Sequence, residues 1–270
     1  MARSRGGRRA PREGAAGATG ARLTRRRAAG FLQWGTAIAV VGGVAWWFSA
    51  REAPAARLYR EGRELQPQAQ RAAAIGRYEQ ALAADPSRVD ARFFLGQSLL
   101  ADNRVSDAIP HLNAAVTAGV RPDVAPFDLA RALASTGDQA AAQRALARLK
   151  IPPQADTGSF VTAGRFAEAL RDLPLAIQFY AQANERADVP LAIVERLGVL
   201  LATSNRAGEA IAVLERGIVR APGEATLYLN LAVALAQEGR LAEARARLRE
   251  ALRLRPDYPQ AKALAERLGA

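Results

Sequence analysis

Apolar residues near the end of the chain recur at helical spacing. Between Leu241 and Tyr258 they return every three or four positions, whereas arginine and glutamate occupy most of the positions between them. The apolar set is Leu241, Ala244, Leu248, Ala251 and Leu252. This pattern is typical of an amphipathic helix with one packed and one solvated face. The arginines of this stretch are therefore predicted to solvate a packing helix rather than to bind nucleic acid.

Related stretches occur upstream at a fixed period of 34 residues. Alanine occupies one position of each period, at Ala74, Ala108, Ala142, Ala176, Ala210 and Ala244. A large residue follows four positions later, at Tyr78, Leu112, Leu146, Tyr180, Leu214 and Leu248. A small residue stands twelve positions before each alanine, at Gly62, Gly96, Ala130, Gly164, Gly198 and Ala232. Because a small residue lets a first helix approach its neighbour closely, each period predicts a pair of helices.

These positions resemble the tetratricopeptide repeat family, which has a 34-residue pattern of small, aromatic and proline positions. The last period carries the pattern as Tyr228, Leu231, Ala232, Leu235, Ala244, Leu248 and Pro256. The preceding period carries it as Leu197, Gly198, Leu201, Ala210, Leu214 and Pro222. The resemblance covers roughly residues 55–258 without an insertion. It implies an all-α fold, a right-handed α-solenoid of about six helix hairpins.

Two features modify this solenoid. After Pro256, residues Gln260 to Leu268 are expected to form one more helix with a small apolar face, which would cover the end of the stack. Pro152 and Pro153 follow the third helix pair, and they indicate a changed angle between the third and fourth pairs.

The positive charge of the chain is concentrated in its first 50 residues. The formal net charge is +12, and residues 1–50 hold nine arginines against the single acid Glu13, a balance of +8. Basic and acidic residues are mixed along the remaining chain, as on solvated helix faces. Residues 1–27 are predicted to be a disordered basic tail. This distribution does not predict a nucleic-acid partner for the repeats. Binding of the basic tail to nucleic acid or to anionic lipid is a separate hypothesis.

The next segment has the composition of a membrane span. Phe31 to Ser49 contains 19 residues without a charge, which as a helix extend about 28 Å, close to the thickness of a bilayer core. Residues 28–50 are therefore predicted to form one transmembrane helix before the repeat domain of residues 51–270. The arginines before this helix place the N-terminus in the cytoplasm and the repeats on the far side. The composition looks bacterial, so the expected location is the inner (cytoplasmic) membrane, with the repeats in the periplasm or outside the cell.

A cleavable signal peptide is the main alternative to this anchor. Ala53, Pro54 and Ala55 form a site of the A-x-A kind, and Arg25 with Arg26 resembles part of a twin-arginine signal. The apolar run is longer than a usual signal-peptide core, so retention is favoured.

A stripe of small residues lies within the predicted span. Gly35, Ala39 and Gly43 are four residues apart, which would let two such helices pack closely. Glycine and alanine are also simply common in membrane helices. Homo-oligomerisation through this stripe is therefore a hypothesis.

No catalytic or metal-binding constellation is predicted. The chain has no cysteine and a single histidine, His111, so neither a Cys/His pair nor a histidine-rich metal site can be assembled within one chain. No glycine loop suited to phosphate occurs either, and Gly119, Gly137, Gly158 and Gly239 fall at expected helix ends. No cofactor and no enzymatic activity are expected.

The resemblance instead implies a binding surface. In relatives the first helix of each pair lines a concave groove that holds a peptide. The corresponding positions here are Tyr59, Phe93, Phe127, Val161, Glu195 and Leu229, and one turn later Arg63, Gln97, Arg131, Arg165, Val199 and Val233. The predicted site consists of Tyr59, Arg63, Phe93, Gln97, Phe127, Arg131 and Arg165. Each of these side chains has the alternative of packing between neighbouring repeats.

Aromatic side chains beside arginines suit a protein partner with acidic and hydrophobic residues. Tyr59 and Arg63 stand where some relatives have the lysine and asparagine that clamp a chaperone's terminal carboxylate, so binding of such tails is not expected. The sequence predicts a membrane-anchored protein-binding scaffold for envelope assembly, secretion or a related complex. The alternative is a regulatory or substrate-recruiting, non-catalytic subunit of a membrane enzyme complex.

Overall fold

The computed structural model describes residues 53–66 and 70–269. The chain divides into two units, Met1–Arg57 and Leu58–Ala270, and the second holds the repeats from Leu58 onward. The predicted tail of residues 1–27, the predicted transmembrane helix of residues 28–50 and the stripe of Gly35, Ala39 and Gly43 lie outside the described residues. Among the helices of residues 53–66 and 70–269, none combines the length and the apolar character that a membrane crossing needs.

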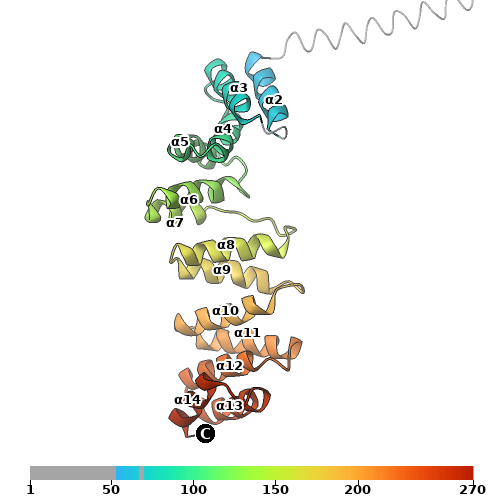
Figure 1. Cartoon of the computed structure of the whole chain (residues 1–270), viewed down its shortest axis with the longest axis vertical. Coiled ribbons are helices and arrows are strands. Elements are labelled where there is room, and N and C mark those ends of the chain that lie inside the picture. The colour runs from blue at the N-terminus through green and yellow to red at the C-terminus, as the bar shows by residue number, and fades with distance from the viewer. Residues whose placement is uncertain (1–52, 67–69, 270) are drawn as a thin grey trace, which may run out of the picture. The chain divides into compact units, whose positions relative to one another are not determined.

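The described residues form thirteen α-helices and no strand. The first helices of the six hairpins are α2 (Pro54–Leu65), α4 (Val89–Ala101), α6 (Ala125–Ser135), α8 (Thr157–Ala169), α10 (Leu191–Thr203) and α12 (Ala225–Gln237). The second helices are α3 (Arg71–Ala84), α5 (Val105–Thr117), α7 (Gln139–Leu146), α9 (Leu173–Asn184), α11 (Ala207–Arg220) and α13 (Leu241–Leu254). From α4 onward the hairpins stack in chain order (Figure 1). The prediction of an all-α array of six hairpins is confirmed, and its right-handedness stays a prediction.

The last helix is α14 (Pro259–Leu268), one residue longer than the predicted segment. Its Ala261 and Ala265 are buried, and it packs on α13. Arg245 of α13 donates from Nε to the carbonyl oxygen of Leu268 at 2.7 Å, which satisfies one of the last carbonyls of α14. The predicted terminal helix is therefore confirmed.

Glycine in the first helix allows close approach of the second helix. A Cβ atom added to Gly164 would lie 2.5 Å from the ring of Tyr180, and one added to Gly62 would lie 2.6 Å from the ring of Tyr78. Gly96 and Gly198 face Leu112 and Leu214 at the same 2.6 Å. These four large side chains are at most 1% exposed. The small residues of the 34-residue pattern thus set the spacing within the hairpins.

Two hairpins have alanine at the position where the other four have glycine. Ala130 and Ala232 occupy the glycine position in the third and sixth hairpins, and the residues sixteen positions later are Leu146 and Leu248. Tyrosine occurs there in two of the four glycine hairpins, the first and the fourth, and in neither of the alanine hairpins. A tyrosine ring therefore occurs at this position only where the facing residue of the first helix is glycine and has no Cβ atom.

A residue with left-handed backbone closes each hairpin from the second to the sixth. These residues are 34 apart, at Asn103, Gly137, Arg171, Asn205 and Gly239, with φ between 58° and 87°. In each turn the next amide returns to the carbonyl five residues earlier, as from Arg104 to Leu99 at 2.9 Å. This geometry ends the first helix in the manner that glycine and asparagine favour. Arginine at position 171 is the least suited of the five.

The junction between the third and fourth hairpins is the loosest of the described array. Helix α7 has only eight residues and is followed by a loop that contains Pro152 and Pro153. Helices α7 and α8 touch over a short stretch, whereas α5 with α6 and α11 with α12 pack along their length. The prolines therefore coincide with an opened junction, and the change of angle stays a prediction.

Candidate protein-binding groove

Two clefts lie between successive first helices. The α4–α6 cleft has a volume of about 480 Å³, and its lining includes Gln97, Asp128 and Arg131. The α6–α8 cleft has a volume of about 590 Å³, and its lining includes Phe127 and Ile151. Three of the seven predicted groove residues therefore line a cleft: Gln97, Phe127 and Arg131.

A buried carboxylate organises the α4–α6 cleft. Asp128 is 8% exposed. Gln97 of α4 donates from Nε2 to its Oδ2 at 2.8 Å, and Arg131 donates from Nη2 to its Oδ1 at 3.3 Å. Because Asp128 neutralises Arg131, this arginine brings no unpaired positive charge to the cleft. Sequence reasoning missed Asp128, although its place one helical turn before Arg131 was a signal for an ion pair.

An aromatic cluster lies between α2 and α4. The ring of Tyr59 is 5.9 Å from that of Phe94, and the guanidinium carbon of Arg63 lies 4.1 Å from the centre of the Phe94 ring. Arg63 is exposed and forms no ion pair within the part of the chain that the structure describes. Tyr59, Arg63 and Phe94 thus combine apolar area with a positive charge.

Phe93 follows the alternative of packing between repeats and does not reach the groove surface. This ring is 1% exposed, and it lies edge-on to Phe94 with 4.9 Å between ring centres. The guanidinium carbon of Arg121, from the loop between α5 and α6, lies 5.9 Å from the centre of the Phe93 ring. Phe94 is the half-buried phenylalanine of this helix and takes the surface position instead.

The α6–α8 cleft has a second aromatic pair at its edge. The rings of Phe127 and Phe166 are 5.1 Å apart, and both are half-buried. Asp156 caps α8 in the lining of this cleft, and hydrogen bonds from the Ser159 side chain and backbone lower the pKa of its carboxyl. Arg165, the seventh predicted residue, is exposed but lines neither cleft. It forms no ion pair among the described residues.

The later groove positions are mostly packed. Val161 and Leu229 are 8% and 7% exposed, so they follow the alternative of packing between repeats. Val199 and Val233 are half-buried. Burial raises the pKa of the Glu195 carboxyl, and the neighbouring Glu224 adds to this shift.

An ion pair that the sequence did not reveal joins α8 to α10. Arg196 donates from Nε to Glu168 at 2.7 Å, and the hydroxyl of Tyr180 donates to the same carboxylate at 2.6 Å. Burial is the largest single influence and acts to raise the pKa of Glu168, but these two hydrogen bonds together with the charges of Arg196 and Arg165 outweigh it and hold the pKa below its ordinary value. The partners lie 28 and 12 residues away along the chain, so helical spacing could not reveal them.

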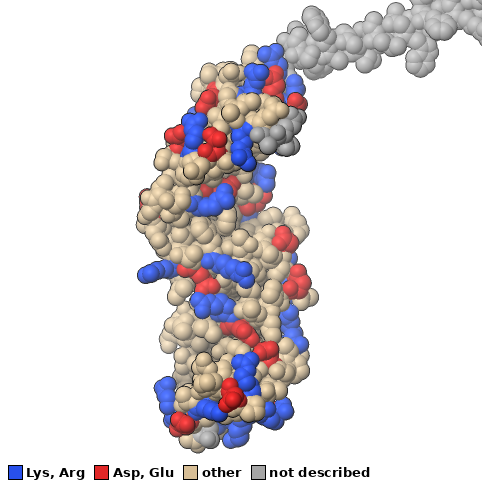
Figure 2. Space-filling model, in the orientation of Figure 1, with Lys and Arg blue, Asp and Glu red and all other residues tan. Residues whose placement is uncertain are grey.

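Charged side chains are mixed over the surface. Figure 2 shows basic and acidic side chains interspersed over the described face rather than gathered by sign. Within the described ranges no group of three or more histidine, cysteine or acidic residues is placed to hold a metal ion. Burial, followed by repulsion from Arg92, lowers the pKa of the single histidine, His111.

Stacked helix hairpins with clefts between their first helices define a helical-repeat protein of the protein-interaction class. Two models of the family described as tetratricopeptide repeat match the chain, at residues 59–120 and 201–268. The chain is a tetratricopeptide repeat protein, and the resemblance of its 34-residue pattern is confirmed. No curated protein matches it in sequence.

Several solved structures are similar in arrangement. The APC/C hetero-tetramer Cut9-Hcn1 is 17% identical with a TM-score of 0.41, over 86% of this chain and 45% of the other, so this chain spans less than half of its length. A tetratricopeptide repeat protein from Parabacteroides merdae ATCC 43184 is 14% identical with a TM-score of 0.45, over 80% and 85% of the two chains. The TPR2AB-domain:pHSP90-complex of yeast Sti1 is 18% identical with a TM-score of 0.36, over 78% and 95%.

Proposed function

We propose that this protein is a scaffold that binds an acidic and hydrophobic segment of a partner protein along its first helices. The observation that carries the proposal is the cluster of Tyr59, Arg63 and Phe94, where an exposed guanidinium that has no acidic partner among the described residues stacks on a ring. A carboxylate of the partner can bind this guanidinium while an apolar side chain covers the rings. The α4–α6 cleft next to it offers Gln97 for further hydrogen bonds.

The membrane location belongs to the same proposal. Its support is the uncharged segment from Phe31 to Ser49 with arginines before it. A scaffold held at the inner membrane with its repeats outside the cytoplasm would raise the local concentration of its partner there, as envelope assembly or secretion requires. Resistance of the full chain to alkaline extraction from membranes, and release of a variant that lacks residues 28–50, would support the anchor. Release of both would contradict it.

The decisive experiment is crosslinking from intact membranes, followed by affinity measurement with the captured partner segment. The test variant is Arg63→Glu with Arg165→Glu, since these two arginines form no ion pair within the described residues. The control is Arg249→Glu with Arg267→Glu, which changes the net charge equally on exposed positions of α13 and α14. We expect the test variant alone to lose the partner. Equal binding by both variants would refute the assigned surface.

A second function class is a recruiting subunit of a membrane enzyme complex. The mixed charges and clefts of the surface serve either role. Copurification with an enzyme whose activity falls when this chain is deleted would favour recruitment, whereas copurification without that loss would favour a passive scaffold.

A further inference from the structure

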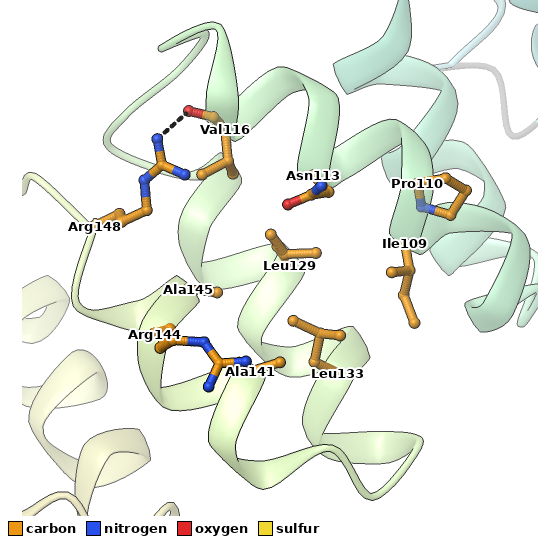
Figure 3. Close-up of a pocket in the computed structure, with 10 residues that line it drawn as sticks. All are labelled: Ile109, Pro110, Asn113, Val116, Leu129, Leu133, Ala141, Arg144, Ala145 and Arg148. Carbon is orange, nitrogen blue, oxygen red and sulfur yellow. Dashed lines mark hydrogen bonds between the residues drawn. The ribbon is translucent and has the colours of Figure 1, made fainter.

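A separate pocket lies between two second helices. The α5–α7 pocket has a volume of about 570 Å³. In Figure 3, Ile109 and Pro110 of α5 lie on one side of it, and Arg144 of α7 with Arg148 just after it lies on the other. The remaining lining consists of Asn113, Val116, Leu129, Leu133, Ala141 and Ala145. None of the predicted groove residues lines this pocket.

The same pocket recurs two repeats later in a smaller form. The α9–α11 pocket uses positions 68 residues further along, such as Ile177 for Ile109, but its volume is only about 240 Å³. Glu209 and Val213 stand there in place of Ala141 and Ala145. The two alanines of α7 are smaller than their counterparts in α11, which fits the larger volume of the α5–α7 pocket.

The charges of the two pockets also differ. In the α9–α11 pocket Arg206 forms an ion pair with Glu209 at 2.7 Å, and Arg216 approaches Glu185 at 3.9 Å. No acidic residue lines the α5–α7 pocket. Within the described residues Arg144 forms no ion pair and Arg148 has no carboxylate partner.

Arg148 is held in place by a neutral group. It donates from Nη2 to the carbonyl oxygen of Val116 at 3.2 Å, a bond drawn in Figure 3. This bond leaves the positive charge of Arg148 uncompensated, and Arg144 adds a second charge on the same rim. An apolar floor below two such guanidinium groups is complementary to a ligand that carries an apolar group next to a carboxylate.

We infer that the α5–α7 pocket is a second binding site, for an internal peptide segment with a leucine-sized or aromatic side chain beside an aspartate or glutamate. The apolar side chain occupies the space that Ala141 and Ala145 leave, against Leu129 and Leu133. The carboxylate binds Arg144. The amide of Asn113 on the rim offers a donor and an acceptor for a peptide backbone. A fatty acyl chain has no such groups along its length, so this amide favours a peptide ligand over a lipid.

The test uses a library of random heptapeptides displayed within a carrier loop, so that no free carboxyl terminus is present, selected on the purified full chain. We expect enrichment of peptides that place an apolar residue next to an acidic one. The blocking variant is Ala145→Phe, because Phe179 occupies the corresponding position of α9 and is buried there. The charge variant is Arg144→Gln. Each variant should weaken an enriched peptide at least tenfold.

The control is Arg216→Gln in the smaller α9–α11 pocket, the same substitution at the position that corresponds to Arg148, which should leave affinity unchanged. Equal affinity for the wild type, Ala145→Phe and Arg144→Gln would overturn the inference, as would a selection that enriches no peptide. Binding of dodecanoate with no peptide enriched would overturn it in favour of a lipid ligand. The groove variant Arg63→Glu with Arg165→Glu should still bind the enriched peptides. If this variant loses them, the peptides bind the groove and not the α5–α7 pocket. The two sites can therefore fail independently.

Discussion

The contact between Gly164 and Tyr180 makes a specific prediction about stability. A Cβ atom at position 164 would lie 2.5, 2.6 and 3.1 Å from three ring atoms of Tyr180. The ring cannot easily move away, because it is 1% exposed and its hydroxyl donates to Glu168 at 2.6 Å. Gly164→Ala must therefore separate α8 from α9 or push the ring off its hydrogen bond.

Two opposing effects set the change in the free energy of unfolding. Alanine in a helix interior is favoured over glycine by about 0.5–1 kcal/mol. Inserting a methyl group into a closely packed contact costs about 1–3 kcal/mol. We expect Gly164→Ala to lower the free energy of unfolding by about 1–2 kcal/mol. Gly76→Ala in α3 should raise it by about 0.5–1 kcal/mol, because a Cβ atom there meets nothing within 4 Å.

Urea unfolding followed by circular dichroism measures both changes. The double variant Gly164→Ala with Tyr180→Leu tests the cause, since the third and sixth hairpins combine alanine with leucine at these positions. It should lose less stability than the sum of the single variants. If Gly164→Ala is as stable as Gly76→Ala, or if the double variant shows no rescue, the close-approach argument is refuted.

Three further predictions concern a turn, an ion pair and a buried acid. Arg171→Gly should raise the free energy of unfolding by about 0.5–1 kcal/mol in urea titration, because relief of left-handed strain outweighs the added freedom of the unfolded chain. The pKa of Glu168 is lowered in the folded state, so its pairing with Arg196 stabilises the fold at pH values above the ordinary glutamate pKa of 4.5. This stabilisation is lost as the pH falls through the lower folded-state pKa. Thermal melts from pH 7 to pH 3 should show the loss in the wild type but not in Glu168→Gln. Asp128→Ala should lower the free energy of unfolding by about 1–3 kcal/mol, because Gln97 loses its buried acceptor. The comparison variant is Asp138→Ala, which removes a helix cap and should cost about 1 kcal/mol. Thermal melts of the two variants measure how much more stability Asp128→Ala loses.

The fold was predictable because its determinants repeat. The small residue, the alanine and the large residue of each hairpin recur every 34 positions, and the close contacts within the glycine hairpins use the small and large positions. The terminal helix followed from its apolar face alone. The loose junction had only a local signal, in Pro152 and Pro153.

The site was less predictable because residues at equivalent positions of the 34-residue repeat have different surroundings. Phe93 and Phe127 are 34 residues apart, yet the first is buried with the Arg121 guanidinium over its ring while the second lines a cleft. Loop conformation varies from hairpin to hairpin, so a repeat pattern could not distinguish these two rings. The ion pair of Glu168 with Arg196 likewise joins different hairpins at positions that carry no such pair in the other repeats.

The loose junction between α7 and α8 has a consequence for cooperativity. In a linear array each hairpin is stabilised by its neighbours, so the weakest coupling decides where the array separates into blocks that unfold independently. The short contact of α7 with α8 divides the six hairpins into two blocks of three. Hydrogen exchange should therefore show two levels of protection, with the change at this junction. The α6–α8 cleft crosses the same boundary, so a ligand that binds both of its walls would couple the two blocks and make them unfold together.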